Sequence, residues 1–248
     1  MHRRAGRAKA FPVSDVEPIA PRRPRLLVSL RDADEALTAL TAGADLIDAK
    51  DPERGALGAL SPETVRAIVA RVGGRATTSA VAGDGSGEGI AQAVAAMAAT
   101  GVDFIKIAVG SADETALAQA AARAPGRVIG VLFAEDGVAA DAPDRLAAAG
   151  FAGAMIDTRG KTGTALPALL PAAHLAAFVA TCRARGLMSG LAGSLALSDI
   201  PALAALHPDY LGFRGGLCQG GDRRQGLDGA RLARAVAAIR LRPRADAA

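Results

Sequence analysis

Residues 42–50 read Ala-Gly-Ala-Asp-Leu-Ile-Asp-Ala-Lys. The glycine is typical of a helix C-cap, and the apolar run that follows is typical of a short buried strand. Similar junctions recur at 100–103 (Thr-Gly-Val-Asp) and 149–152 (Ala-Gly-Phe-Ala). A repeated passage from helix through glycine to strand predicts an α/β fold in which the two kinds of element alternate.

The rest of the chain extends this alternation. Short apolar runs predict strands at 26–30, 46–50, 76–83, 104–110, 127–135, 153–158, 187–193 and 210–216. Ala-rich stretches predict helices near 32–42, 61–71, 87–100, 112–123, 143–149, 172–185, 199–206 and 228–239. Eight strands and eight helices within about 220 residues predict a single (β/α)₈ barrel, the TIM barrel.

An open doubly wound sheet is the alternative architecture. Such a sheet would carry a glycine-rich turn after its first strand, but residues 29–32 read Ser-Leu-Arg-Asp. The glycine-rich segment lies at 83–89 instead and satisfies GxGxxG in no frame. The dinucleotide-binding interpretation is therefore weak, and a flexible active-site loop is expected there.

Composition divides the chain into one domain and two tails. Half of the 248 residues are hydrophobic, which is enough for one large core. Residues 1–24 are rich in Arg, Pro and Ala without periodicity and predict a disordered basic extension. The barrel is expected over 25–240, followed by a short tail at 241–248.

Charge and cysteine usage exclude several classes of protein. The net charge of +4 comes largely from the two ends of the chain, and aromatic residues make up only 3%, so no nucleic-acid binding is expected. Cys182 and Cys218 lie far apart, which predicts neither a disulfide framework nor a zinc site. No secretory signal or apolar run of membrane-spanning length is evident. We therefore expect a cytoplasmic homo-oligomer that acts on a small molecule.

Lysine is rare in this chain. Of the 29 Lys and Arg residues, only four are lysines: Lys9, Lys50, Lys106 and Lys161. Arginine remains protonated near neutral pH, whereas a lysine whose pKa is lowered by its surroundings can act as a nucleophile or accept a proton. Lys9 lies in the basic extension, and the other three lie in or just after predicted strands.

Alternation along the predicted strands places polar side chains inside the barrel. Asp48 and Lys50 are two residues apart and face one side, Lys106 lies centrally in its strand, and Asp157 faces inward with Lys161 in the following loop. Because layers in such barrels take side chains from alternate strands, Lys50, Lys106 and Asp157 are expected to meet at the mouth. Repulsion between two ammonium groups would lower the pKa of one of them. Structural ion pairs, Lys106 with Asp48 or Asp157 and Asp48 with Lys50, remain the alternative.

Glycine-rich segments end the last two predicted strands. In TIM barrels these two loops commonly hold phosphate through backbone N–H groups. Ordinary strand-to-helix turns are the alternative, and a further segment at 219–223 could close over an anion. The predicted phosphate- or substrate-binding residues are Gly193, Ser194, Arg214, Gly215, Gly216, Gly220, Gly221 and Asp222.

Histidine and metal chemistry are not expected. The three histidines are His2, His174 and His207, of which the first lies in the tail and the others lie in or beside predicted helices. The carboxylates at the mouth also lack the paired spacing of a metal site. Cys218 lies near the last glycine-rich loop but has no base beside it in the sequence.

Several segments together carry a resemblance to one known family. The segment 46–59 matches that family's signature IDxKxPxxGxLGA, and further similarity lies at 103–106, 155–158 with Lys161, 191–195, 214–216 and 220–223. Over roughly residues 26–239 the chain thus resembles the (5-formylfuran-3-yl)methyl phosphate synthases of methanofuran biosynthesis.

The resemblance implies a TIM-barrel enzyme without metal or organic cofactor. Such an enzyme joins two molecules of glyceraldehyde 3-phosphate into a furan with one formyl and one phosphomethyl group, and releases one phosphate and two waters. By position, Lys50 matches the Schiff-base lysine and Lys106 the proton-accepting lysine. Asp48, Asp157 and Lys161 match other polar residues of the family's active site. A carbon–oxygen lyase acting on phosphates is thus expected.

Two other functions stay open at the level of sequence. A class I aldolase or isomerase of sugar phosphates needs the same lysines and phosphate loops. A barrel without catalytic activity that only binds a phosphate ligand is the alternative from another class. The products formed and the trapping of an imine on lysine would separate the three.

Overall fold

The computed structural model describes residues 23–84, 87–110, 112–159 and 164–241. Four predictions from the sequence concern residues wholly or partly outside these ranges: the basic extension, the C-terminal tail, the glycine-rich loop at 83–89, and Lys161. The prediction of an α/β barrel, in contrast, can be compared with the described chain directly.

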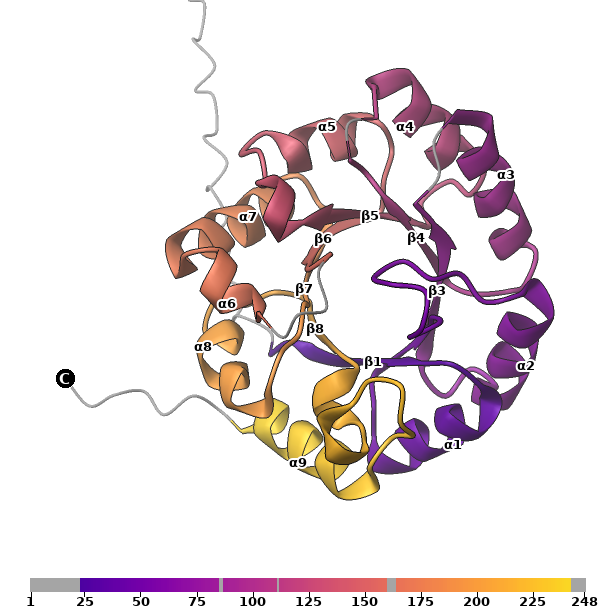
Figure 1. The fold of residues 1–248 in the computed structure, drawn as a ribbon. Helices are drawn as coiled ribbons and strands as arrows, with labels where there is room; N and C mark the ends of the chain where they lie inside the picture. The colour runs from indigo at the N-terminus through magenta and orange to yellow at the C-terminus, as the bar shows by residue number, and fades with distance from the viewer. Residues whose placement is uncertain (1–22, 85–86, 111, 160–163, 242–248) are drawn as a thin grey trace, which may run out of the picture.

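Eight parallel strands form a closed barrel in the order β1 to β8, with β8 pairing with β1. Figure 1 shows the strands as an inner ring with the helices around it, which confirms the predicted TIM barrel. The strands are β1 (Arg25–Leu30), β2 (Leu46–Ala49), β3 (Thr77–Gly83), β4 (Phe104–Ala108), β5 (Val128–Phe133), β6 (Gly153–Asp157), β7 (Met188–Leu191) and β8 (Tyr210–Phe213).

The helices lie close to the predicted ranges. They are α1 (Ala33–Ala42), α2 (Pro62–Val72), α3 (Gly87–Ala98), α4 (Glu114–Ala122), α5 (Ala142–Ala148), α6 (Leu166–Leu169), α7 (Ala172–Ala184), α8 (Ile200–Ala204) and α9 (Gly229–Arg240). Short 3₁₀ turns add η1 (Ala134–Asp136), η2 (Leu197–Asp199), η3 (Gly215–Leu217) and η4 (Gln219–Gly221). Helix α6 and the 3₁₀ turns were not predicted.

The predicted strands were mostly too long at their C-terminal ends. The prediction 127–135 ended in the 3₁₀ turn η1, and 210–216 ended in η3. In both segments the backbone leaves the strand ladder before the predicted end, because β5 ends at Phe133 and β8 ends at Phe213. Hydrogen bonding between neighbouring strands, which decides where a strand ends, cannot be read from side-chain polarity.

The helix–glycine–strand junctions have the expected conformation. Gly43, Gly101 and Gly150 have φ of 92°, 90° and 85°, a region that favours glycine. At the first junction the Gly43 N–H bonds to the carbonyl of Leu40 at 3.0 Å. Asp45 then accepts the Leu26 N–H with its side chain at 2.8 Å, which fixes the start of β2 beside β1.

Two apolar layers hold the barrel together. Outward-facing strand residues such as Leu26, Val28 and Ile47 pack against the helices in the larger cluster. A smaller cluster fills the barrel interior and includes Leu46 and Tyr210. Tyr210 is fully buried and occupies the space that a side chain at Gly190 would need, so it helps to fill the interior where β8 begins.

In the described part of the chain, no helix combines the length and apolar character needed to cross a membrane.

Candidate active site

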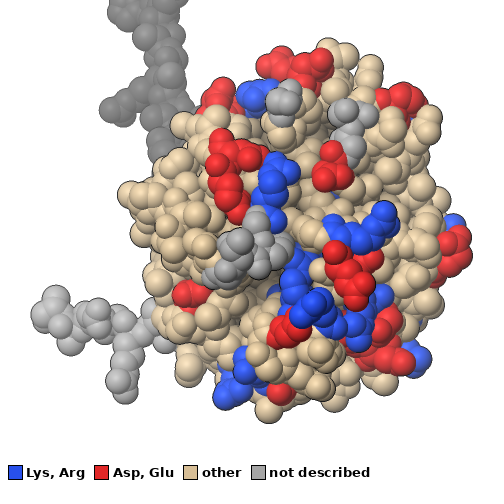
Figure 2. Space-filling view, in the orientation of Figure 1, with Lys and Arg blue, Asp and Glu red and all other residues tan. Residues whose placement is uncertain are grey.

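A cavity of about 320 Å³ opens at the C-terminal ends of the strands. Its wall is formed by residues from several strands and the loops that follow them: Leu27, Ser29, Lys50, Lys106, Met155, Asp157, Ala192, Gly193, Ser194, Leu195, Gly212, Phe213, Arg214, Gly215, Gly216, Gly221, Asp222 and Arg223. Figure 2 shows this end of the molecule, with Lys and Arg side chains gathered near its middle and acidic side chains around them. A cavity with this lining suits a small anion.

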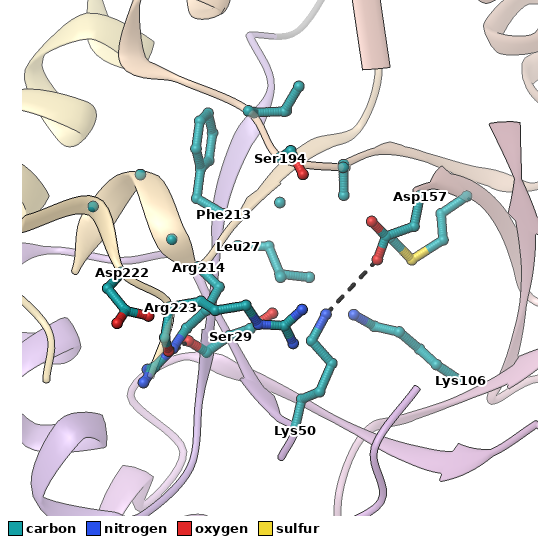
Figure 3. A pocket seen from close by; sticks show the side chains of 18 residues that line it. Leu27, Ser29, Lys50, Lys106, Asp157, Ser194, Phe213, Arg214, Asp222 and Arg223 are labelled. Atoms are coloured by element: carbon teal, nitrogen blue, oxygen red, sulfur yellow. Dashed lines mark hydrogen bonds and ion pairs between the residues drawn. The ribbon is translucent and has the colours of Figure 1, made fainter. Parts of the chain in front are cut away.

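Lys50, Lys106 and Asp157 lie together in this cavity. They come from the end of β2, from β4 and from the last position of β6, and Figure 3 shows the three side chains pointing toward one another. The predicted inward placement of these side chains therefore holds on three even-numbered strands, β2, β4 and β6. Lys161, predicted beside them, lies outside the described residues.

Asp48 and Lys106 form a buried ion pair at the base of the site. Lys106 Nζ lies 2.8 Å from Asp48 Oδ1, and the two side chains are only 3% and 1% exposed. Ser29 donates to Asp48 Oδ2 at 2.8 Å, and Ser79 donates to Oδ1 at 2.7 Å. The carboxylate is therefore held by three donors. Of the three structural ion pairs considered, Lys106 with Asp48, Lys106 with Asp157 and Asp48 with Lys50, the first is present at 2.8 Å.

The serines Ser29 and Ser79 were missed at the level of sequence. Both follow the same inward alternation as Asp48, on β1 and β3, and both are its register partners on the two neighbouring strands. A polar side chain at an inward position of an otherwise apolar strand was the available signal.

Burial and charge shift the pKa values of this pair. Burial lowers the pKa of Lys106 below its ordinary value, Asp48 acts in the opposite direction, and the nearby Lys50 lowers it further. For Asp48, burial acts to raise the pKa, but the charges of Lys106 and Lys50 and the serine hydrogen bond outweigh it, so the pKa is lowered. The expected repulsion between the two lysines therefore acts on Lys106.

Lys50 lies above this pair and closer to solvent. Its Nζ is 3.7 Å from Asp157 Oδ2, and its side chain is 11% exposed, compared with 3% for Lys106. The Thr158 N–H donates to Asp157 Oδ1 at 2.7 Å, which orients the carboxylate. The more accessible amine is therefore the one that follows β2.

The loops after β7 and β8 bring backbone close to the cavity, as predicted for a phosphate site. Gly193 and Ser194 both have positive φ, 115° and 49°. A Cβ on Gly193 would lie 2.8 Å from the Thr158 nitrogen, and one on Gly216 would lie 2.6 Å from the Leu195 carbonyl oxygen. Such close backbone packing requires glycine, and it leaves main-chain groups facing the cavity.

Only part of the third predicted segment, residues 219–223, reaches the cavity. Gly221 and Asp222 line the cavity, whereas Gly220 does not. Asp222 is bound by the exposed Arg224, whose hydrogen bonds lower the pKa of Asp222 to about 2.

Arg214 was predicted to bind substrate, but its guanidinium is engaged by the protein. All five of its N–H groups have acceptors: both Glu35 oxygens at 2.5 and 3.1 Å, and the carbonyls of Ser29, Arg223 and Gln225 at 3.3, 2.9 and 3.0 Å. Arginine carries only five such donors, so none is left for a ligand. The residue joins α1, β1 and the loop after β8.

No group of three or more His, Cys, Asp or Glu side chains with metal-site geometry occurs among the described residues. Both cysteines are buried, and burial raises the pKa of Cys182 to about 12. The polar chemistry of the cavity thus lies with its lysines, carboxylates and arginines.

Comparison with known proteins decides the family. Residues 26–236 match the family profile described as 4-HFC-P synthase. The chain belongs to the (5-formylfuran-3-yl)methyl phosphate synthase family. A Methylorubrum extorquens relative, provisionally assigned that name, is 76% identical over 95% of this chain and 100% of the relative. The synthase of Methanopyrus kandleri is 35% identical over 87% of this chain and 98% of the relative.

Solved structures agree with the fold of the family member described here. Phosphoribosyl anthranilate isomerase from Thermus thermophilus has a TM-score of 0.66 at 19% identity, covering 87% of this chain and 98% of that one. A 3-hexulose-6-phosphate synthase has a TM-score of 0.60 at 20% identity, covering 87% and 99%. At these identities the likeness concerns the barrel alone.

Proposed function

We propose that this protein condenses two molecules of glyceraldehyde 3-phosphate into (5-formylfuran-3-yl)methyl phosphate through an imine on Lys50. The reaction would release one phosphate and two waters and would serve methanofuran biosynthesis. Membership of the family supports the reaction type. The observation that carries the mechanism is the placement of two lysines and a carboxylate, Lys50, Lys106 and Asp157, in one cavity.

The difference in burial supports separate roles for the two lysines. Lys50 is the amine nearer to solvent, so it can reach the carbonyl carbon of a triose phosphate and form the imine with loss of water. Lys106 lies beneath it with a lowered pKa, which favours a neutral amine that accepts a proton. The ion pair with Asp48 then provides a place where that proton is stabilised.

Proton transfers are the main demand of the proposed reaction. The imine becomes an enamine by losing a proton from the adjacent carbon, and carbon–carbon bond formation, phosphate elimination and dehydration each move further protons. Asp157, 3.7 Å from Lys50 Nζ, is positioned to exchange a proton with the imine nitrogen or its neighbours. The family resemblance also assigns Lys161 to the site, as a proposal.

Trapping and product analysis test this function. Borohydride reduces an imine to a stable secondary amine, so incubation with glyceraldehyde 3-phosphate should add mass to Lys50. Lys50→Arg keeps the positive charge but cannot form the imine at neutral pH, so it should abolish both trapping and turnover. The product should appear as a conjugated aldehyde that absorbs ultraviolet light, which an aldolase or isomerase of sugar phosphates would not form.

The outcomes separate the candidate functions. An adduct on Lys106 would reverse the assignment of roles. Absence of any lysine adduct, or retained turnover in Lys50→Arg, would refute the Schiff-base mechanism. Trapping without the ultraviolet-absorbing product would favour the aldolase or isomerase alternative.

A further inference from the structure

The guanidinium of Arg223 has donors that no described residue uses. One Nη2 hydrogen bond goes to the Gly55 carbonyl at 2.8 Å. The Nε is buried, and it has no acceptor within the described ranges of the chain. A buried donor without an acceptor is unfavourable, so this N–H is suited to an acceptor supplied from the cavity.

Arg223 differs in this respect from the other cations of the cavity. Lys106 is paired with Asp48 at 2.8 Å, and Lys50 is 3.7 Å from Asp157. Arg214 donates all five of its N–H groups to Glu35 and main-chain carbonyls. Arg223 thus carries a positive charge and unused hydrogen-bonding capacity at the same point of the wall.

The backbone of Arg223 is held firmly enough to aim its side chain. Its carbonyl accepts from Arg214 Nε at 2.9 Å, and Arg214 is in turn fixed by Glu35. The bond to Gly55 ties its guanidinium to the loop after β2, the strand end that carries Lys50. In Figure 3 the Arg223 guanidinium reaches toward Lys50, while the Arg214 side chain runs the other way.

We propose that Arg223 binds the phosphate of the triose phosphate that reacts at Lys50. The identity of this ligand rests on the proposed function, whereas the anion-binding capacity rests on the contacts of Arg223 itself. Arginine binds phosphate through two parallel charge-assisted hydrogen bonds. The glycine-rich loops after β7 and β8 are then available for the phosphate of the second triose, so the two substrates are held by different chemistry.

Binding of an unreactive analogue tests the anion site without any chemistry. Glycerol 3-phosphate keeps the phosphate but lacks the carbonyl, so it cannot form an imine. Titration calorimetry on the full-length chain should show binding that Arg223→Gln weakens about ten-fold or more, because a charge-assisted hydrogen bond is lost. Arg223→Lys, which keeps the charge but not the planar fork, should weaken it less.

Arg54→Gln is the matched control. Arg54 is exposed, and it adjoins Gly55, the residue that accepts from Arg223. The control removes one positive charge from the same loop region without touching the cavity wall. Binding of glycerol 3-phosphate should be unchanged, which separates direct contact from the general effect of charge.

Trapping at Lys50 tests whether Arg223 serves the reacting triose. For Arg223→Gln, the concentration of glyceraldehyde 3-phosphate that gives half-maximal borohydride trapping should rise about ten-fold or more. Trapping with glyceraldehyde, which lacks the phosphate, should match that of the unaltered protein. Equal sensitivity with both aldehydes would indicate a general defect and overturn the proposal.

The remaining outcomes distinguish this proposal from the proposed function. If the unaltered protein traps trioses but Arg223→Gln and Arg223→Lys bind glycerol 3-phosphate normally, the role of Arg223 is refuted and the mechanism stands. If no lysine is trapped but both variants lose glycerol 3-phosphate binding, the anion site stands and the mechanism is refuted. Failure of the unaltered protein to bind glycerol 3-phosphate would also refute the role of Arg223. Should Arg223→Gln fail to fold, Arg223→Lys decides.

Discussion

At the scale of single residues, the site separates two lysines by their surroundings. Lys106 is buried against Asp48, whose carboxylate is held in turn by Ser29 and Ser79, so the amine is removed from solvent and its position is fixed. Lys50 reaches the cavity with more of its surface exposed. The two lysines can therefore take different proposed roles, because Lys106 is more fully removed from water than Lys50.

Replacing Asp48 should change the pH dependence of turnover. The Asp48 carboxylate raises the pKa of Lys106, and burial and Lys50 lower it. Proton acceptance by Lys106 requires the neutral amine, so turnover should rise with pH through the pKa of Lys106. Asp48→Asn removes the stabilising anion, lowers that pKa further, and should move the rising limb of the kcat–pH profile to lower pH.

The matched control for this change is Asp34→Asn. Asp34 lies on α1 with a side chain that is 96% exposed, so its neutralisation should leave the rising limb in place. A shift of the limb to higher pH in Asp48→Asn would contradict the assignment of Lys106 as the proton acceptor.

At the scale of elements, the loops after β6 and β7 pack closely against each other at Gly193. Gly193 has φ of 115°, and a Cβ there would lie 2.6 Å from the Thr158 Cγ2 and 2.8 Å from its backbone nitrogen. The Thr158 N–H holds the carboxylate of Asp157. The backbone of the predicted phosphate loop therefore determines where a carboxylate of another strand can lie.

Gly193→Ala should lower both stability and activity. Backbone strain costs about 1–3 kcal/mol and the overlap a further 1–3 kcal/mol, so a loss of about 2–6 kcal/mol in the free energy of unfolding is expected. Displacement of Thr158 should also turn Asp157 and reduce trapping at Lys50. Urea denaturation and the trapping assay measure the two effects.

Gly74→Ala provides the comparison for Gly193→Ala. Gly74 also has positive φ, 72°, but nothing lies within 4 Å of the position of its Cβ. It should show the backbone cost alone, about 1–2 kcal/mol, with unchanged trapping. Equal losses in the two variants would show that contact with Thr158 is unimportant.

At the scale of the whole molecule, a buried ion pair links the first and last parts of the barrel. Arg214 follows β8, and Glu35 lies in the first turn of α1, with side chains 7% and 8% exposed. The pair reinforces the seam where β8 pairs with β1. Arg214 also donates to the carbonyl of Arg223. The same ion pair therefore supports both the closure of the barrel and the position of the proposed anion site.

Arg214→Met should destabilise the barrel strongly. Removal of Arg214 leaves the buried Glu35 carboxylate with only the partly exposed Arg31, whose Nε lies 3.6 Å from Oε1. Loss of the buried partner should therefore cost about 3–5 kcal/mol. The double substitution Arg214→Met with Glu35→Leu should recover part of that loss, because no unpaired charge remains. Urea unfolding curves of the single and double variants measure both effects.

A surface pair supplies the control for the Arg214 experiment. Arg66→Met removes a cation that lies 3.4 Å from Glu63 on the exposed face of α2, and it should leave the unfolding midpoint nearly unchanged. A comparably small change for Arg214→Met would contradict the structural importance of its five hydrogen bonds.

Sequence alone determined the alternation of elements and the inward positions of Asp48, Lys50, Lys106 and Asp157. Both follow from local periodicities, since a strand alternates its side chains and glycine favours the helix ends at Gly43 and its counterparts. The family resemblance then added the expected roles, which spacing could not supply.

Tertiary structure decided which of these groups meet. The ion partner of Asp48 is Lys106 rather than its neighbour Lys50, because strand register across the barrel sets that distance. Likewise, Arg214 forms its ion pair with Glu35, which is 179 residues away in the chain, whereas the Nε of Arg223 has no described acceptor. Contacts between residues so distant in sequence depend on barrel closure, and no local pattern records them.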